Sequence, residues 1–111
     1  MLEVRFRRDS RQRLSSVFAS GHAAFSEHGT DIVCAAASAI LQCAWLGAQE
    51  YAGVDIAADR ASGHLVLRWP EHARDDDSLR AIMSTAELGI EQIAHQFPQY
   101  VRIVKESESA P

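Results

Sequence analysis

The sequence predicts an α+β fold in which two helices cover one face of a mostly antiparallel sheet. Three observations predict this fold: short segments of alternating apolar and polar residues, two longer segments with helical spacing, and short links between the strands. Their order is ββαββαβ, which favours a two-layer sandwich. The 111 residues, 47% of them hydrophobic, suit a single domain with one core. We place that domain at residues 1–105 and expect a disordered tail at 106–111.

The first half of the chain is predicted to contain two strands and a buried helix. Apolar and charged residues alternate over 2–7, which is typical of a half-buried strand. A polar turn at 9–13 leads to a second strand at 14–20, paired with the first as a hairpin. The helix at 31–51 is apolar on nearly every side. We therefore expect it to pack against the sheet and against the second helix or a dimer partner.

The second half repeats this order with one more strand. A third strand is predicted at 54–59 and a fourth at 64–69, with a turn between them. An amphipathic helix follows at 79–97, with Asp77 or Ser78 as its N-terminal cap. The last strand is predicted at 100–104.

Charge and targeting features limit the possible functions. A net charge of −4 argues against a general nucleic-acid binder. We interpret the arginines near the start as the solvated face of an edge strand, with ribosomal RNA contact as the alternative. No signal peptide or membrane span is expected, and two cysteines without a secretion signal suggest a reducing cytoplasm. The early arginines are Arg5, Arg7, Arg8, Arg11 and Arg13.

A loop and a helix start hold the candidate reactive residues. Gly21 and Gly29 bracket a loop that contains His22, and Cys34 follows near the start of the first helix. Thr30 or Asp31 can cap this helix; with Asp31 as N-cap, Cys34 is the third helical residue, close to unpaired backbone N–H groups. Helix N-termini favour thiolates, which are the nucleophilic form of cysteine. His22 is twelve residues earlier and can fold back as a general acid and base.

Two other interpretations of these residues are open. A single cysteine in an apolar helix is more often a small buried hydrophobe than a nucleophile. His22, His28, Asp31 and Cys34 could also bind zinc, although their spacing matches no standard pair of ligands. Ser38 is one turn beyond Cys34, where it either lines the same pocket or bonds back to the carbonyl of residue 34. We expect no metal and no cofactor.

The segment from Gly21 to residue 39 resembles the signature of the ribosomal-processing cysteine protease family (Prp). The matching residues are Gly21-His22-Ala23, Gly29, Asp31 through Ala36, Ser38 and Ala39. The resemblance implies that His22 and Cys34 are the catalytic pair. It also implies a homodimer that removes a short N-terminal extension from large-subunit ribosomal protein number twenty-seven, cutting after paired aromatics. Asp31, Ser38, Gly21 and Gly29 are possible supporting residues.

The main alternative to a protease is a non-catalytic dimeric module that associates with the ribosome. Such a module would bind a ribosomal protein or ribosomal RNA through the basic N-terminal strand. Reversing the charges of Arg5 and Arg7 would then abolish binding, whereas Cys34→Ala would leave it intact.

Overall fold

The computed structural model describes residues 1–21 and 30–108 of the chain. The predicted order of strands and helices is confirmed, with one 3-10 turn before the second helix. The elements are β1 (Leu2–Arg8), β2 (Leu14–Ser20), α1 (Thr30–Glu50), β3 (Ala57–Ala61), β4 (His64–Arg68), η1 (Glu71–Ala73), α2 (Asp77–Gln96) and β5 (Val101–Ser107).

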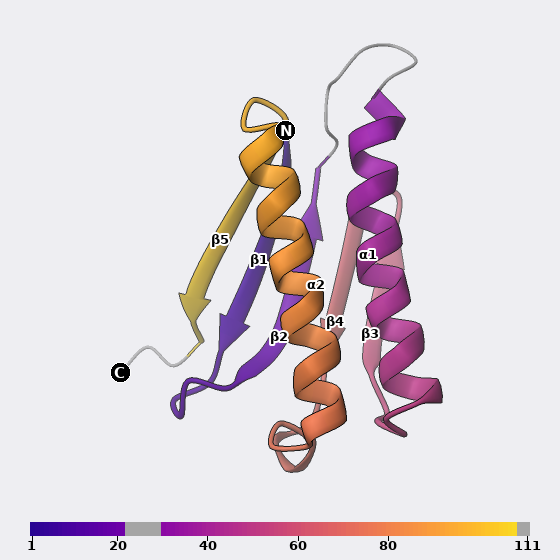
Figure 1. Ribbon diagram of the computed structural model, residues 1–111, viewed down its shortest axis with the longest axis vertical. Helices are drawn as coiled ribbons and strands as arrows, with labels where there is room; N and C mark the ends of the chain where they lie inside the picture. Colours follow the sequence, from indigo (N-terminus) through magenta and orange to yellow (C-terminus); the bar gives the residue numbers. More distant parts are fainter. Residues whose placement is uncertain (22–29, 109–111) are drawn as a thin grey trace.

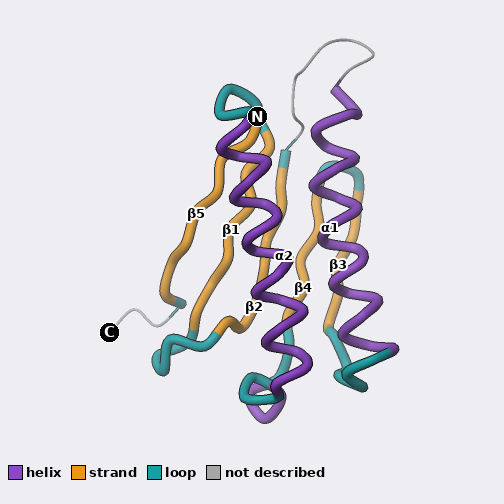
Figure 2. Tube along the Cα trace, viewed as in Figure 1, coloured by secondary structure: helices purple, strands orange, loops and turns teal. Residues whose placement is uncertain are grey.

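The five strands form one mixed sheet in the order β3-β4-β2-β1-β5. Three of the neighbouring pairs are antiparallel, and only β1 and β5 run parallel. Both helices lie side by side on the same face of this sheet (Figures 1 and 2). The predicted α+β two-layer sandwich is therefore confirmed.

The expectation that the N-terminal strand is an edge strand is wrong. β5 pairs with β1 along its whole length, with Glu3 opposite Arg102, so β1 lies inside the sheet. The early arginines on the open face are held by acidic neighbours: Arg5 donates to Glu3 at 2.6 Å and to Glu106 at 2.8 Å. This pairing leaves little unbalanced positive charge on β1 for ribosomal RNA.

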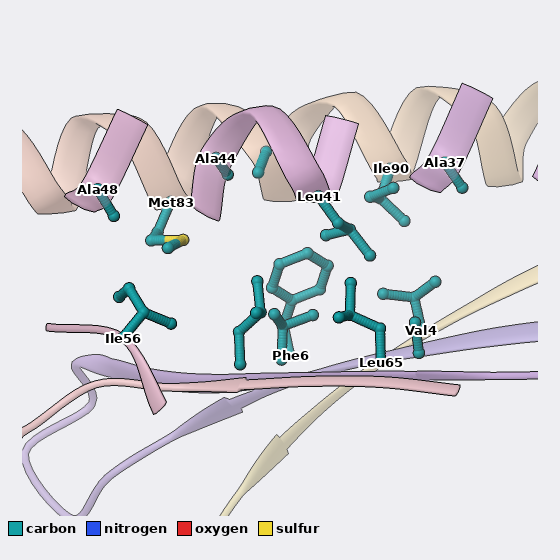
Figure 3. Packing of buried hydrophobic residues seen from close by; sticks show 14 of the residues in the cluster. Val4, Phe6, Ala37, Leu41, Ala44, Ala48, Ile56, Leu65, Met83 and Ile90 are labelled. Carbon is teal, nitrogen blue, oxygen red and sulfur yellow. The ribbon is translucent and has the colours of Figure 1, made fainter. Parts of the chain in front are cut away.

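Buried side chains from both layers meet between the sheet and the helices. Val4 and Phe6 of β1 are fully buried and point toward the helices (Figure 3). From above, α1 contributes Ala37, Leu41, Ala44 and Ala48, and α2 contributes Leu79, Met83, Ala86 and Ile90. Both sets follow the three-to-four-residue spacing of a helix face, as the sequence predicts.

Small residues allow the two helices to approach closely. A Cβ atom added to Gly89 of α2 would lie 3.1 Å from Cδ1 of Ile40 on α1. One added to Gly47 of α1 would lie 3.5 Å from Cδ1 of Ile82 on α2. These contacts fix α1 beside α2, and thereby fix where its first turns stand over the sheet.

The segment Ile32–Glu50 of α1 is long and apolar enough to cross a membrane, with a mean hydropathy of 1.5, contrary to expectation. A core helix of a folded domain passes the same test of length and composition. Here Val33, Ala37, Leu41, Ala44 and Ala48 all lie in the core beneath the helix. Packing explains the apolar character of these residues, which belong to the 28% of the segment that is buried.

Several predicted boundaries need correction. The third strand is Ala57–Ala61, because Val54 and Ile56 are buried beneath the helices as part of the loop that precedes it. The N-cap of α2 is Asp76, whose carboxylate accepts a hydrogen bond from the Leu79 N–H at 2.9 Å. β5 extends to Ser107, so the first residues of the expected disordered tail belong to the sheet.

A buried carboxylate fixes the β1–β2 turn, at the opposite end of the sheet from Gly21. Asp9 accepts hydrogen bonds from the backbone N–H groups of Arg11 and Arg13 and from the guanidinium of Arg74 at 3.0 Å. Burial alone would raise the pKa of Asp9, but these hydrogen bonds outweigh it and hold the pKa well below its usual range. The turn therefore depends on a charged Asp9.

Candidate active site

A cavity of about 330 Å³ opens where the N-terminal half of α1 passes over the end of β2. Its apolar floor consists of Leu2, Ala19, Leu41 and Leu65. The β3–β4 hairpin forms one side, and Cys34 and Ser38 of α1 form another. A mostly apolar hollow with a few polar groups at its rim is the usual form of a small binding site.

Cys34 lies on the cavity wall near the start of α1. The helix begins at Thr30, so Asp31 lies inside it and Cys34 is the fifth helical residue, not the third that an Asp31 cap predicts. The N–H groups without an intrahelical partner belong to the first turn, before Cys34. Helical side chains lean toward the N-terminus, which directs Cys34 back toward those groups. The residue is partly exposed.

Gly21 forms the edge of the cavity at the end of β2. Its φ of +95° is a conformation that favours glycine. Its N–H donates to the carbonyl oxygen of Gly63 at 3.0 Å, which joins β2 to the β3–β4 turn. A Cβ atom at this position would lie 2.4 Å from the carbonyl oxygen of Met1. The close approach of three chain segments therefore requires glycine here.

Ser38 lines the cavity, as one of its two predicted roles requires, and belongs to a hydrogen-bonded group at the rim. Gln42 donates to its Oγ at 2.6 Å, and Arg60 of β3 donates to Gln42 at 3.2 Å. The sequence analysis did not identify Gln42 or Arg60. The i to i+4 spacing from Ser38 could have indicated Gln42, but Arg60 arrives through the sheet and leaves no local signal.

His64 is exposed, as predicted, and it also lines the cavity. Its Nε2 lies 3.6 Å from a carboxylate oxygen of Asp59, so a protonated ring would form an ion pair with β3. The cavity thus has a histidine on the side formed by the hairpin. The other predicted surface histidines, His72 and His95, are exposed and lie elsewhere on the fold.

Other predicted site residues fall outside the described structure. His22, His28 and Gly29 belong to the undescribed segment 22–29, and the side chain of Asp31 is also not described. The pairing of His22 with Cys34 therefore stays a prediction. Within residues 1–21 and 30–108, no group of three His, Cys, Asp or Glu side chains could hold a metal ion. The zinc hypothesis stays untested because two of its four ligands lie in that segment.

A cysteine near the start of a helix, facing a cavity with an apolar floor, is the arrangement of an enzyme that uses a thiolate. The chain belongs to the cysteine protease Prp family, whose model matches residues 1–102. The protein is accordingly a cysteine protease, and the non-catalytic interpretation is not supported.

Solved structures share this fold over nearly the whole chain. The ribosomal processing protease Prp from S. aureus, in complex with a covalently linked product peptide, has a TM-score of 0.86 at 23% identity, over 95% of this chain and 99% of that one. The same protease with a substrate peptide has a TM-score of 0.82 at 22% identity, with the same coverage. SMU.848 from Streptococcus mutans has a TM-score of 0.83 at 26% identity, over 97% of this chain and 96% of that one. No curated protein sequence matches the chain significantly.

Proposed function

We propose that the protein is an endopeptidase that removes a short N-terminal extension from large-subunit ribosomal protein number twenty-seven. One observation carries the proposal: Cys34 lines a concave site whose floor is apolar and whose edge is Gly21, the residue before His22. The S. aureus protease with the same fold is described with bound substrate and product peptides, which supports a peptide ligand for the corresponding site.

The cavity suits an apolar side chain of an extended peptide. Its floor of Leu2, Ala19, Leu41 and Leu65 offers no charged group, so an aromatic or aliphatic side chain would lose water there at little cost. The polar groups lie at the rim, where the peptide backbone would pass. Such a division favours cleavage next to an apolar residue and fits an extension that is cut after aromatics.

The proposed chemistry uses Cys34 as nucleophile and His22 as general acid and base. The thiolate of Cys34 attacks the scissile carbonyl carbon, and negative charge moves onto its oxygen, where N-terminal amides of α1 can donate hydrogen bonds. Protonated His22 gives its proton to the departing amine as the C–N bond breaks, leaving a thioester. Water, deprotonated by His22, then hydrolyses the thioester, which releases the extension as a carboxylic acid and restores the Cys34 thiolate beside protonated His22.

A cleavage assay with purified protein tests the proposal. The substrate is a peptide that covers the ribosomal-protein extension and its junction, with a shuffled peptide as control, and products are identified by mass. We expect the wild type to cut only the junction, and Cys34→Ala and His22→Ala to cut neither peptide. Cleavage of the junction by Cys34→Ala would disprove the nucleophile, and indifference to peptide sequence would disprove the substrate.

We also propose a cytoplasmic homodimer that makes no stable contact with nucleic acid. Ile32 and Leu46 of α1 are large apolar side chains that are 65% and 61% exposed. If this face joins two copies, Leu46→Glu gives monomers in size-exclusion chromatography with light scattering. Leu88→Glu on α2 changes an equally exposed leucine and should leave the dimer intact. Identical masses for both variants would refute this interface.

A further inference from the structure

Three side chains from two elements form a hydrogen-bonded chain along the rim of the cavity. Nη1 of Arg60, on β3, donates to Oε1 of Gln42 at 3.2 Å. Nε2 of Gln42 donates to Oγ of Ser38 at 2.6 Å. Ser38 and Gln42 follow Cys34 at intervals of four residues on α1, so the three share one face of the helix, and all line the cavity with Arg60.

The hydrogen bonds between these three side chains can run in only one direction, from Arg60 through Gln42 to Ser38. A guanidinium has donors and no acceptor, so Gln42 must present its carbonyl oxygen to Arg60 and its amide nitrogen to Ser38. That amide nitrogen is also only a donor, so Ser38 must accept through its oxygen. The hydroxyl has a single hydrogen. Because Gln42 uses Ser38 only as an acceptor, this hydrogen is left to donate away from Gln42, and Cys34 lies one turn earlier on the same helix face.

Arg60 is held in place by a second contact from α1. Its guanidinium carbon lies 6.0 Å from the centroid of the Trp45 ring, at the outer limit of a cation–π contact. Nε1 of Trp45 donates to Gln49 at 3.1 Å, which fixes the orientation of that ring. Arg60 therefore approaches Gln42 from a defined side, and the direction of the hydrogen bonds does not depend on bound substrate.

We propose that Arg60 and Gln42 are positioning residues that orient the Ser38 hydroxyl as a hydrogen-bond donor toward Cys34. The donor would stabilise negative charge on the Cys34 sulfur or on the carbonyl oxygen that it attacks. This inference rests on the proposed role of Cys34 as nucleophile. The same contacts would also serve as a purely structural link between β3 and α1, so the two roles are separated by a substitution that keeps the link and reverses the Ser38 hydroxyl.

The substitution Gln42→Glu reverses the direction in which the Ser38 hydroxyl donates but keeps the hydrogen-bonded link to Arg60. A carboxylate accepts from both sides, so it keeps the contact with Arg60 but makes Ser38 donate to residue 42 instead of into the cavity. We expect kcat/KM for the junction peptide to fall about 10-fold, the factor that one ordinary hydrogen bond supplies, with an unchanged thermal midpoint. Gln42→Leu frees the hydroxyl to rotate and should cost less. If Gln42→Glu retains full activity, the proposal is wrong.

Two controls exclude the added negative charge as the cause. Gln92→Glu places the same charge on an exposed position of α2, outside the cavity lining, and should leave kcat/KM unchanged. In a Ser38→Ala background, Gln42→Glu should have no further effect, because the hydroxyl through which it acts is gone. A full loss in that background would show a through-space charge effect and overturn the proposal. Arg60→Met should reduce activity and Arg60→Lys should retain most of it.

The rate at which iodoacetamide alkylates Cys34 tests the orientation without any peptide. Cys43 is exposed and would also react, so all variants carry Cys43→Ala. We expect Ser38→Ala and Gln42→Glu to slow alkylation about fivefold at neutral pH. If the wild type cuts no ribosomal-protein peptide but this order of rates holds, the proposed substrate is wrong and the orientation stands. Equal alkylation rates would refute the orientation whatever the protein cleaves.

Discussion

Gly21→Ala is expected to lower the free energy of unfolding by more than the cost of placing an alanine at a positive φ. Gly21 has φ +95°, and its new Cβ atom would lie 2.4 Å from the Met1 carbonyl oxygen, whereas ordinary contacts are 3.4–4 Å. The clashing atom belongs to the backbone at the start of β1, so no side chain can rotate away to relieve it. The two segments must separate by about 1 Å, which strains the Gly21 to Gly63 hydrogen bond.

Gly53→Ala is the matched control. Gly53 has φ +69°, but nothing lies within 4 Å of an added Cβ atom. An alanine at positive φ costs about 1–2 kcal/mol, partly offset by the smaller entropy of the unfolded chain, so we expect a net loss of about 1 kcal/mol. Gly21→Ala has the same cost of a positive φ and, in addition, the cost of the clash with Met1, so we expect a total loss of about 2–4 kcal/mol.

Urea unfolding, followed by the fluorescence of Trp45 and Trp69, measures both variants. We expect the unfolding free energy of Gly21→Ala to be lower than that of Gly53→Ala by at least about 1 kcal/mol, with equal m-values. Gly21 also forms the cavity edge, so cleavage should fall even at temperatures where the variant is folded. If the two variants are equally stable, the close approach of β1 and the end of β2 does not exist as described.

Three further predictions concern charges and the core. Arg8 donates to both carboxylate oxygens of buried Glu87, so Arg8→Met should lower the unfolding free energy in urea by about 3–5 kcal/mol. Adding Glu87→Gln should recover much of this loss, and no recovery would contradict a buried ion pair. Because folding lowers the pKa of Asp9, its contribution to the free energy of unfolding is complete above about pH 4 and is lost as the pH falls further. Asp9→Asn should therefore flatten the dependence of the thermal midpoint on pH in acid. An unchanged slope would argue against this role of Asp9. Asp76→Ala removes the cap of α2 and should cost about 1 kcal/mol by urea unfolding, whereas Asp77→Ala should cost less; equal losses would restore Asp77 as the cap.

Alternation of residue type was enough to predict the fold and most strands. β1 falls where the period of two places it, because one of its faces lies in the core and the other outside, whereas β2 was predicted as its hairpin partner and has three successive buried residues. The same pattern failed at Val54 and Ile56, which are buried by loop packing and not by strand geometry. The cap of α2 was missed by one residue because Asp75, Asp76 and Asp77 are chemically identical and only the fold selects among them.

The candidate site was predictable where it is local in sequence. Cys34, Ser38 and Gly21 do line one cavity, because one helix face and one strand end carry them. Arg60 could not be found, since it reaches Gln42 only through the pairing of β3 with β4 and β4 with β2. The position of β1 inside the sheet was missed for a similar reason: its partner β5 is about a hundred positions away, and its charges resemble those of an edge strand.

The parallel pairing of β1 with β5 also has a kinetic consequence. Glu3 and Arg102 become neighbours only after about a hundred further residues have been synthesised, so a nascent chain exposes one flank of its first strand until β5 is made. Contacts between such distant positions slow the search for the native state. The sheet should therefore be completed only after β5 has been synthesised, and chains that stall before this strand should be prone to aggregation.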